Sequence, residues 1–379
     1  MHISVERSEL ITVLKRTGVA ITEGKAEAYK SCVLIDGGAM TFRKTGDALS
    51  VICKATGNSH KPGRALLNHR RLSSIVNELP PGLVDITVND KLKTVVKSTV
   101  SKRKFDMPSH DPADYPPALD SAPGGVLYTI ESKIFQQNAS EVAFGIDASR
   151  TNGALLVPFG GNRFRLMTLG SGAFCSAIGW FAETASGAST DEVLLPSVLL
   201  AGASALPSDS THVGIHINGG RVALVTDRTT VGCALLAIEM PRVWQFLLDS
   251  VPKEKRFRVS SEAYLASVKA VMVGAEVVEG EDKFVEIHTA YKDGDCLIST
   301  LPSETNYGED QLIVSDPSQT AYRVAMNGMR LAQALRSFVP YEIDVFYEAI
   351  NGQQTLVLQN ENLLVAMSTI DIVRAKGAP

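Results

Sequence analysis

The sequence lacks several features that would place it in common protein classes. Its five cysteines are scattered, odd in number and never arranged as CxxC, which is typical of a reduced cytosolic protein without a structural zinc site. The N-terminal residues include an early charge at Glu6, and no apolar run approaches the ~18 residues of a membrane span, so we expect neither a secretory signal nor a membrane anchor. The expected location is the cytoplasm.

An excess of charge of one sign is also missing. The 37 Lys and Arg residues face 41 Asp and Glu residues, which leaves a formal net charge of −4 and a pI near 6.0. Domains that hold nucleic acid through their overall charge usually lie above about pI 9. Disorder is excluded as well, because 45% of the residues are hydrophobic.

Motifs for catalysis and cofactors are absent too. The sequence has no P-loop and no G-x-S-x-G, and its acidic residues are dispersed. His212 and His216 lie in an alternating strand pattern, where four residues span about 13 Å, too far for one metal ion to bridge. The segment from Gly170 to Cys175 imitates a dinucleotide-binding loop but lacks its third glycine. We expect no enzymatic activity, no metal and no cofactor.

What the chain does contain is a threefold internal repeat. Short alternating segments around Val5, Ile130 and Val259 each lead into an amphipathic helix. A second helix in each copy closes on an apolar residue and a proline, and another alternating strand follows. The three closing pairs are Leu79-Pro80, Leu206-Pro207 and Val339-Pro340.

Two landmarks that recur in the same order predict three α+β domains, with bounds near 1–122, 123–252 and 253–379. Each domain would place two helices against antiparallel sheets. The expected helices are Ser8–Thr17, Asn68–Leu79, Ser132–Val142, Ser197–Leu206, Ser261–Met272 and Asn327–Val339.

Charge is not distributed evenly over these elements. The six expected helices contain eight Lys or Arg residues and four Glu residues, a balance of +4, so the rest of the chain carries −8. If the helices share one surface, an acidic protein would present a basic face to a phosphate backbone. The alternative is that Lys and Arg are simply good helix formers on solvated faces. No base-reading motif is present, so any nucleic-acid contact should be sequence-independent.

Three tandem repeats of this kind, opening with Met-His-Ile-Ser-Val-Glu-Arg, resemble the bacterial β sliding clamp, the β subunit of DNA polymerase III. The likeness is strongest in the first domain, in Leu79-Pro80-Pro81-Gly82 and in Phe105-Asp-Met-Pro followed by Pro112-Ala-Asp-Tyr-Pro116. The resemblance implies that two chains join head to tail into a ring of six domains. Helices would line a hole for double-stranded DNA, and the ring would tether the polymerase without chemistry of its own.

The resemblance also implies roles for particular residues. The cations expected to face DNA are Lys25, Arg70 and Arg71, with Lys15, Arg16, Lys133, Lys269, Arg330 and Arg336 as weaker candidates. The helix Ser197–Leu206 has no charge, which departs from the family. The ring interface would join Phe105 and Met107 of one chain to Val271 and Met272 of the next, although core packing also accounts for these apolar residues.

Partner proteins, including the polymerase and the clamp loader, would insert a short peptide into an apolar pocket. Its expected residues are Thr168, Leu169, Gly170, Pro241, Val365 and Met367. The family has a His and an Arg where this chain reads Ser171-Gly172, and the C-terminus extends beyond Met367 to Pro379, so we expect altered peptide specificity.

The predicted function is that of a DNA sliding clamp and processivity factor. A specialised clamp for a repair or translesion polymerase, of plasmid or phage type, and a non-replicative α+β binding protein are the alternatives.

Overall fold

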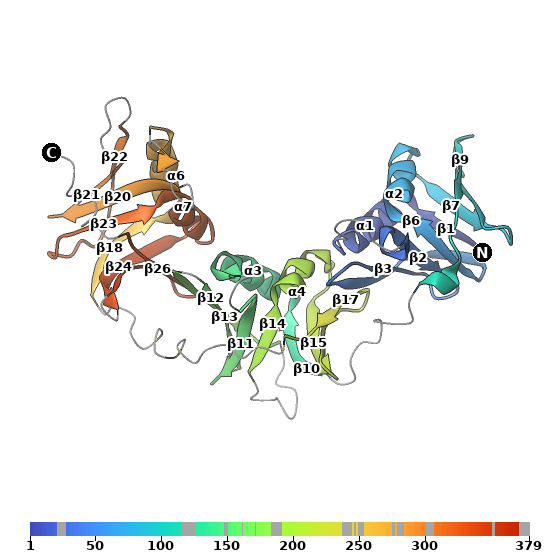
Figure 1. Ribbon diagram of the computed structural model, residues 1–379, viewed down its shortest axis with the longest axis horizontal. Coiled ribbons are helices and arrows are strands. Elements are labelled where there is room, and N and C mark those ends of the chain that lie inside the picture. Colours follow the sequence, from blue (N-terminus) through green and yellow to red (C-terminus); the bar gives the residue numbers. More distant parts are fainter. Residues whose placement is uncertain are drawn as a thin grey trace. The chain divides into compact units, whose positions relative to one another are not determined.

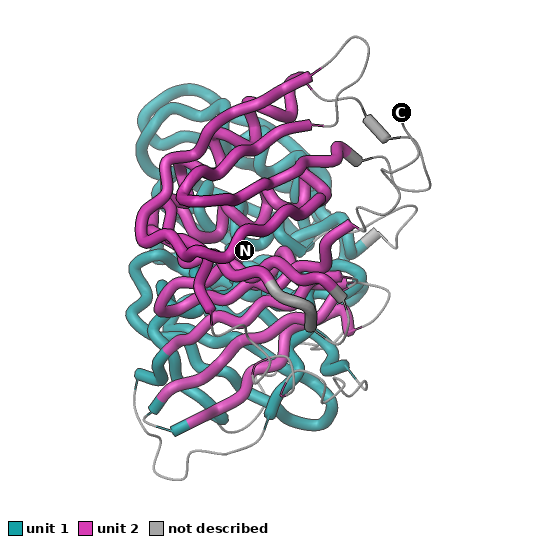
Figure 2. The backbone as a smooth tube through the Cα atoms, turned by 90° about the vertical axis from the view of Figure 1, so that its left-hand side faces the viewer, with its two compact units in different colours: residues 1–139, 160–162, 180–237 teal, residues 140–159, 163–179, 238–379 magenta. Residues whose placement is uncertain are grey.

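The computed structural model of the chain describes residues 1–20, 28–115, 126–147, 151–160, 162–170, 172–182, 192–236, 245, 248, 254–274, 277–278, 284–300, 307–350 and 353–370. Contacts between Cα atoms divide the chain into two compact units, coloured separately in Figure 2. Unit 1 comprises residues 1–139, 160–162 and 180–237, and unit 2 comprises residues 140–159, 163–179 and 238–379. The three predicted domain bounds stay a prediction.

The helices form where the hydrophobic periodicity predicts them (Figure 1). In α2, for example, Leu72, Ile75 and Val76 recur at helical spacing and are buried, which turns one face of the helix to the core. The short α4 continues as a 3-10 turn over Ala203–Ala205. The described α-helices are α1 (Arg7–Thr17), α2 (His69–Glu78), α3 (Ser132–Val142), α4 (Ser197–Gly202), α6 (Ser261–Val273) and α7 (Gly328–Arg336).

Unit 1 contains two antiparallel sheets. The first has the order β5-β1-β7-β8-β9, and the second has the order β10-β15-β16-β17-β4-β3-β2-β6. The second sheet joins strands of the first two repeats, because β17 pairs with β4. Its strands are β10 (Val126–Glu131), β15 (His212–Asn218), β16 (Arg221–Val225), β17 (Thr229–Ala234), β4 (Ser50–Lys54), β3 (Thr41–Thr45), β2 (Cys32–Asp36) and β6 (Arg64–Asn68). The first contains β5 (Gly57–Lys61), β1 (His2–Glu6), β7 (Leu83–Val88), β8 (Lys93–Ser98) and β9 (Lys104–Pro108), and unit 1 also holds β14 (Val193–Pro196).

Unit 2 repeats this plan. One sheet has the order β11-β12-β13-β26-β25-β24-β18, and in the other β20 pairs with β19, β21 and β23 while β21 pairs with β22. The first contains β11 (Gly153–Phe159), β12 (Arg163–Gly170), β13 (Ala173–Trp180), β26 (Leu363–Ser368), β25 (Gln353–Gln359), β24 (Glu342–Ile350) and β18 (Lys255–Ser260). The second contains β19 (Val277–Val278), β20 (Phe284–Lys292), β21 (Asp295–Thr300), β22 (Glu309–Leu312) and β23 (Tyr322–Asn327).

Apolar and aromatic side chains fill the space between the sheets and helices. In unit 2 an aromatic cluster links three strands, with ring centroids 5.2 Å apart for Phe257 and Tyr291 and 5.8 Å apart for Tyr291 and Tyr322. All five cysteines are buried and unpaired, as expected for a reduced protein. In the described part of the chain, no helix is long and apolar enough to cross a membrane.

Several outer strands of these sheets are covered by a neighbouring segment. Isolated bridges place His110 beside β6, Phe181 beside β10, Ser315 beside β18 and Ile370 beside β23. The outer strand β5 has an irregular register opposite His2 and Ile3, and a bulge of this kind protects an edge from unwanted pairing. By contrast, β9 and β22 each pair with one strand, and no described residue pairs with their other side.

Candidate nucleic-acid interface

The C-terminal end of α1 and the N-terminal end of α2 are joined by one histidine. The Nε2 atom of His69, the first residue of α2, lies 2.9 Å from the carbonyl oxygen of Leu14 and 3.3 Å from Oγ1 of Thr17. The carbonyl oxygen can only accept, so Nε2 carries the hydrogen. Burial lowers the pKa of His69 and keeps the ring neutral, which suits this donor role.

Further side chains fix the two ends of α2. The Asn68 side chain accepts a hydrogen bond from the amide of Arg71 at 2.9 Å, which caps the N-terminus. At the C-terminus, Arg7 donates to the carbonyls of Val76 and Asn77, and Arg103 donates to that of Glu78. Cations are favoured at the negative end of the helix dipole, so these contacts stabilise the helix.

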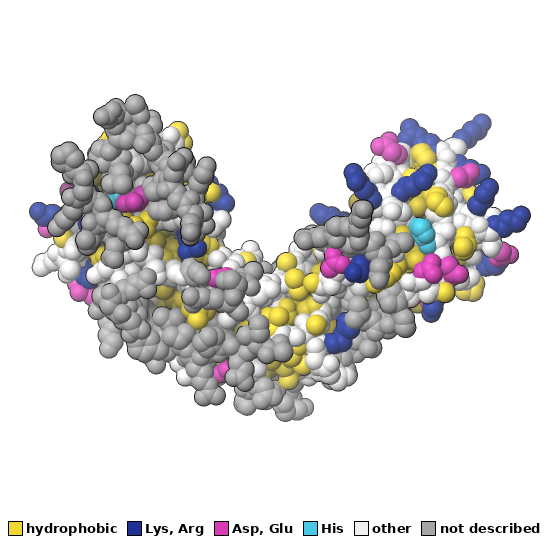
Figure 3. Space-filling model, viewed as in Figure 1, with side chains coloured by type: hydrophobic (Ala, Val, Ile, Leu, Met, Phe, Trp, Pro, Cys, Tyr) yellow, Lys and Arg dark blue, Asp and Glu magenta, His cyan; other side chains and the backbone are white. Residues whose placement is uncertain are grey.

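This arrangement brings together four of the predicted DNA-facing cations. Lys15 and Arg16 belong to the last turn of α1, and Arg70 and Arg71 belong to the first turn of α2. Arg16 is half-buried and the other three are exposed. Among the described residues, none of the four has a carboxylate within 4.0 Å. Figure 3 shows Lys and Arg side chains gathered over the part of unit 1 that carries these helices.

The position of several cations is unfavourable for helix stability. Arg70, Arg71, Lys133 and Arg330 lie in the first turns of α2, α3 and α7, and none of these three turns contains an acidic residue. The N-terminus of a helix carries partial positive charge, so cations there are repelled and anions are attracted. A bound phosphate would relieve that repulsion. Sequence reasoning counted the charges on the helices but did not use their position within each helix.

The remaining predicted DNA-facing residues are distributed as follows. Lys133 is exposed on α3, and Lys269, Arg330 and Arg336 are exposed on α6 and α7 of unit 2. Lys25 lies outside the described residues. The uncharged sequence expected to form a helix from Ser197 is indeed α4, so it contributes no cation.

Arg330 has a neighbour that its predicted role does not explain. A Cβ atom added to Gly172 would lie 3.4 Å from Nη1 of Arg330 and 3.6 Å from Cβ of Ser368. Gly172 has a φ of +76°, a conformation that favours glycine. Arg330 therefore contacts the turn between β12 and β13, which carries the altered segment of the predicted peptide pocket.

The other predicted pocket residues lie on neighbouring strands of unit 2. Thr168, Leu169 and Gly170 end β12, and Val365 and Met367 belong to β26, with β13 between the two strands. Thr168 Oγ1 donates to the carbonyl of Val142 at 2.9 Å, and Thr168, Val365 and Met367 are buried, while Leu169 is half-buried. Pro241 lies outside the described residues. The peptide-binding role stays a prediction.

The predicted interface residues differ in exposure. Met107 and Val271 are buried within the single chain, while Phe105 and Met272 are half-buried. The sequence did not single out Val273, which follows them on α6 and is 89% exposed. Tyr307 and Met329 are exposed as well, and both lie close to the end of α6. A Cβ atom added to Gly274, which follows α6, would lie 3.0 Å from the carbonyl oxygen of Tyr307. A Cβ atom added to Gly328, which precedes Met329, would lie 3.1 Å from Sδ of Met272 in α6. An exposed apolar surface therefore surrounds this end of α6.

The residues that the sequence raised as metal or cofactor candidates lie as follows. No group of three His, Cys, Asp or Glu side chains in this part of the chain is arranged to hold a metal ion. His212 and His216 both lie in β15, as their alternating pattern predicts. The Gly170–Cys175 segment joins β12 to β13, whereas a dinucleotide-binding loop joins a strand to a helix.

Comparisons with known proteins give the following likenesses. Residues 1–120 match the family model of the DNA polymerase III beta subunit, N-terminal domain. No curated protein matches the chain. Among solved structures, the beta subunit from DNA polymerase of Streptococcus pyogenes is 14% identical with a TM-score of 0.84, covering 98% of this chain and 100% of that one. The DNA polymerase sliding clamp from Bacillus subtilis is 15% identical with a TM-score of 0.82, covering 98% and 99%.

The DNA polymerase III beta subunit of Thermotoga maritima is 14% identical with a TM-score of 0.81, covering 97% of this chain and 99% of that one. These likenesses confirm the predicted resemblance at low sequence identity. The chain has the α+β fold of the sliding clamps over nearly its whole length.

Proposed function

We propose that this chain, which has the sliding-clamp fold, acts as a DNA sliding clamp that encircles double-stranded DNA and tethers a DNA polymerase. The observation that carries the proposal is the group of four cations where α1 meets α2, none of which has a carboxylate of a described residue within 4.0 Å: Lys15, Arg16, Arg70 and Arg71. They are available to phosphates, and two of them lie at a helix N-terminus that itself favours anions. Contacts to phosphates alone hold no sequence register, which allows sliding.

Closure into a ring would use the outer edges of β9 and β22, with which no described residue pairs. The residues at β9 are basic, with Lys102, Arg103 and Lys104 all exposed, and β22 begins with exposed Glu309 and Asp310. Two chains arranged head to tail would pair β9 of one with β22 of the other, so that unlike charges meet. Such a contact is heterologous and must close, otherwise a filament results.

Apolar contact would accompany this strand pairing. The exposed side chains of Val273, Tyr307 and Met329 surround the end of α6, close to β22, and Phe105 on β9 is half-buried. Interfaces are built from an apolar centre with a polar rim. The inferred homodimer therefore has an apolar centre on α6 and β9 and charged residues beside the paired edges.

The tethered partners would be a DNA polymerase and a clamp loader, which bind through short peptides at the ends of β12 and β26. The ring would have no catalytic site of its own and would act in the cytoplasm. The non-replicative alternative is not favoured, because the likeness to clamp structures extends over 97–98% of the chain.

Retention on circular and linear DNA tests this function. The clamp loader of the same organism and ATP place the chain on a nicked circular plasmid, which is then isolated by gel filtration, and half of the sample is cut once. We expect a dimer of twice 40.6 kDa that stays on the circle at moderate salt and leaves the linear form within minutes. Equal loss from both forms, governed by salt alone, would contradict encirclement.

A further inference from the structure

The chain that follows β22 is attached to the edge of a different sheet. β22 ends at Leu312, and three residues later the backbone of Ser315 exchanges two hydrogen bonds of 2.8 Å with Arg258 in β18. The amide of Ser318 then donates to the carbonyl of Arg256 at 2.7 Å. Residues 313–318, which we call the strap, therefore cover the outer edge of β18 and fix the point where β22 ends.

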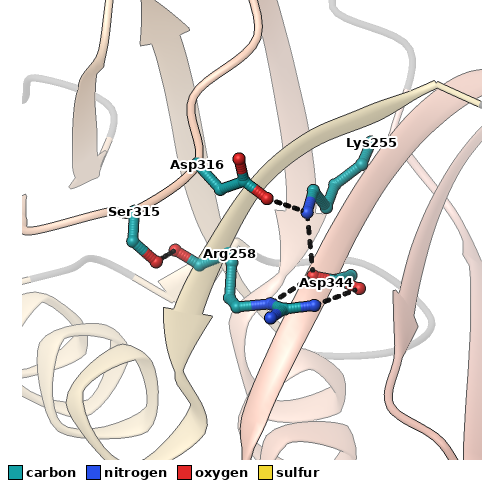
Figure 4. A network of polar contacts seen from close by, with 5 residues as sticks. All are labelled: Lys255, Arg258, Ser315, Asp316 and Asp344. Carbon is teal, nitrogen blue, oxygen red and sulfur yellow. Dashed lines mark hydrogen bonds and ion pairs between the residues drawn. The ribbon is translucent and has the colours of Figure 1, made fainter.

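Charged side chains tie the strap to two strands (Figure 4). Lys255 of β18 forms an ion pair with Asp316 of the strap and lies 3.6 Å from Asp344 of β24. Arg258 donates to both carboxylate oxygens of Asp344, at 2.7 Å and 3.0 Å. Asp344 thus links Lys255 and Arg258, two of the three cations of β18, and Lys255 also holds the strap.

The network is charged at neutral pH. Hydrogen bonds from Arg258, together with the positive charge of Lys255, hold the pKa of Asp344 below its ordinary value. Glu342 on the same strand also faces Arg258 but makes no described ion pair within 4.0 Å. Both Lys255 and Asp344 have side chains that are only 25% exposed, so solvent screens their interaction less than it screens a fully exposed pair.

A second set of contacts holds the far end of the strap and the residues after it. The hydroxyl of Tyr291 donates to the carbonyl of Ser318 at 2.7 Å, and Thr320, two residues beyond the strap, donates to Glu254 at 2.8 Å. Tyr291 belongs to β20, in the same sheet as β22. The strap is therefore bonded to both sheets of this part of unit 2.

We propose that the network of Lys255, Arg258, Asp316 and Asp344 is a positioning device for ring closure, because it fixes the end of the strand edge that pairs with a second copy of this chain. This inference rests on the proposed ring, in which β22 pairs with β9 of the partner. A free strap would let β22 shift or fray at its end, and the edge would have to be ordered again when the dimer forms. The network keeps the end of β22 ordered before the two chains associate.

The test compares Asp344→Asn with a matched control, Glu342→Gln, in the full chain. Both variants remove one carboxylate from β24 two residues apart, but Glu342 makes no described contact with the strap. The dimer dissociation constant is measured by analytical ultracentrifugation, and backbone hydrogen exchange is followed at Ser315, Ser318 and β22. We expect Asp344→Asn to weaken the dimer about fivefold and to speed exchange in the strap and in β22, because it removes two ion pairs. Glu342→Gln should change the constant less than about twofold.

A conservative variant separates positioning from general stability. Asp344→Glu keeps the carboxylate and should restore most of the dimer affinity, even if its melting temperature stays below that of the parent. Unchanged dimer affinity in Asp344→Asn, with faster strap exchange, would overturn the inference. Equal weakening by Glu342→Gln would also overturn it. If the parent chain is monomeric at every concentration, the proposed ring fails, and the positioning role fails with it, while strap exchange still reports whether the network holds the strap.

Discussion

His69 and Leu14 are joined by a hydrogen bond of 2.9 Å that connects the first residue of α2 to the last turn of α1. The two helix ends that it joins carry Lys15, Arg16, Arg70 and Arg71. The histidine contributes no charge at neutral pH, yet the spacing of these four cations depends on it. A neutral, half-buried residue thus connects the two helix ends that carry the proposed DNA-binding surface.

Removing the His69 donor should loosen this helix pair. His69→Phe leaves the ring volume similar but takes the hydrogen bond from the Leu14 carbonyl, so we expect unfolding free energy to fall by about 1–3 kcal/mol. Denaturant unfolding measures the loss. His212→Phe, at an exposed histidine of the same unit, is the control and should change stability by less than about 0.5 kcal/mol. An equal loss of unfolding free energy in both variants would mean that the hydrogen bond to Leu14 does not stabilise the helix pair.

The same histidine should make stability depend on pH. Burial lowers its pKa in the folded state below the value of 6.5 for the free side chain, so the unfolded chain binds the proton first as the pH falls. The free energy of unfolding should therefore decrease as the pH drops from about 6.5 toward the lowered pKa, and His69→Gln should remove this part of the decrease. NMR titration of the His69 ring checks the direction, and a pKa above 6.5 would refute it.

Cations in the first turn of α2 should contribute to DNA retention. Arg70→Gln with Arg71→Gln removes two phosphate contacts, so the slope of log affinity against log salt should fall by about 2 units. Binding to short double-stranded DNA at several salt concentrations measures this slope. Lys91→Gln with Lys93→Gln removes the same charge from the turn after β7 and from the first residue of β8, and this pair is the control. The surface is misassigned if the control has the larger effect.

Two residues near the end of α6, Val271 and Val273, should respond in different ways. Val273 is 89% exposed, so Val273→Asp should leave the melting temperature nearly unchanged but weaken the dimer at least tenfold. Val271 is buried, so Val271→Ala should cost about 2 kcal/mol of stability through lost burial and a cavity. Ultracentrifugation and thermal unfolding of both variants measure the two effects. A stable, fully dimeric Val273→Asp variant would place the interface elsewhere.

Arg330 should affect partner binding more than DNA binding, because its guanidinium lies against the Gly172 turn. Arg330→Gln should lower the affinity of the chain for the polymerase several-fold in a surface-binding assay. It should leave the salt dependence of DNA binding nearly unchanged. Arg336→Gln, at the other end of α7, is the matched control. If Arg330→Gln changes only DNA retention, Arg330 faces DNA, as the sequence predicted, and does not act in partner binding.

Local sequence patterns predicted the elements well. The helix that starts after Asn68 is capped by that side chain, and the one after Asn327 is capped in the same way, with hydrogen bonds to Met329 and Arg330. The repeat of such signals gave the α+β class and the position of each described helix. These features depend on residues a few positions apart, so a single sequence contains the information needed to find them.

Contacts between distant segments could not be predicted in this way. The sequence placed Val271 and Met272 in a ring interface, with core packing as the alternative, and that role stays a prediction. It did not indicate that Val273 is exposed, because the rotation of α6 is set by which of its own residues, such as Tyr264 and Val268, are buried in the fold. It also placed Arg330 with the DNA-facing cations, although its neighbour is a turn more than 150 residues away. Burial and proximity of this kind depend on the whole fold.

The sequence by itself determined the three repeats, the reduced cysteines and the excess of positive charge on the helices, since each of these is a property of composition or short spacing. Within the described part of the chain, the tertiary structure decided which cations have no carboxylate within 4.0 Å, which strand edges have no pairing partner and how the strap is tied to β18. Those features arise where segments far apart in the chain meet, and the energy of such contacts depends on distances that no local pattern encodes.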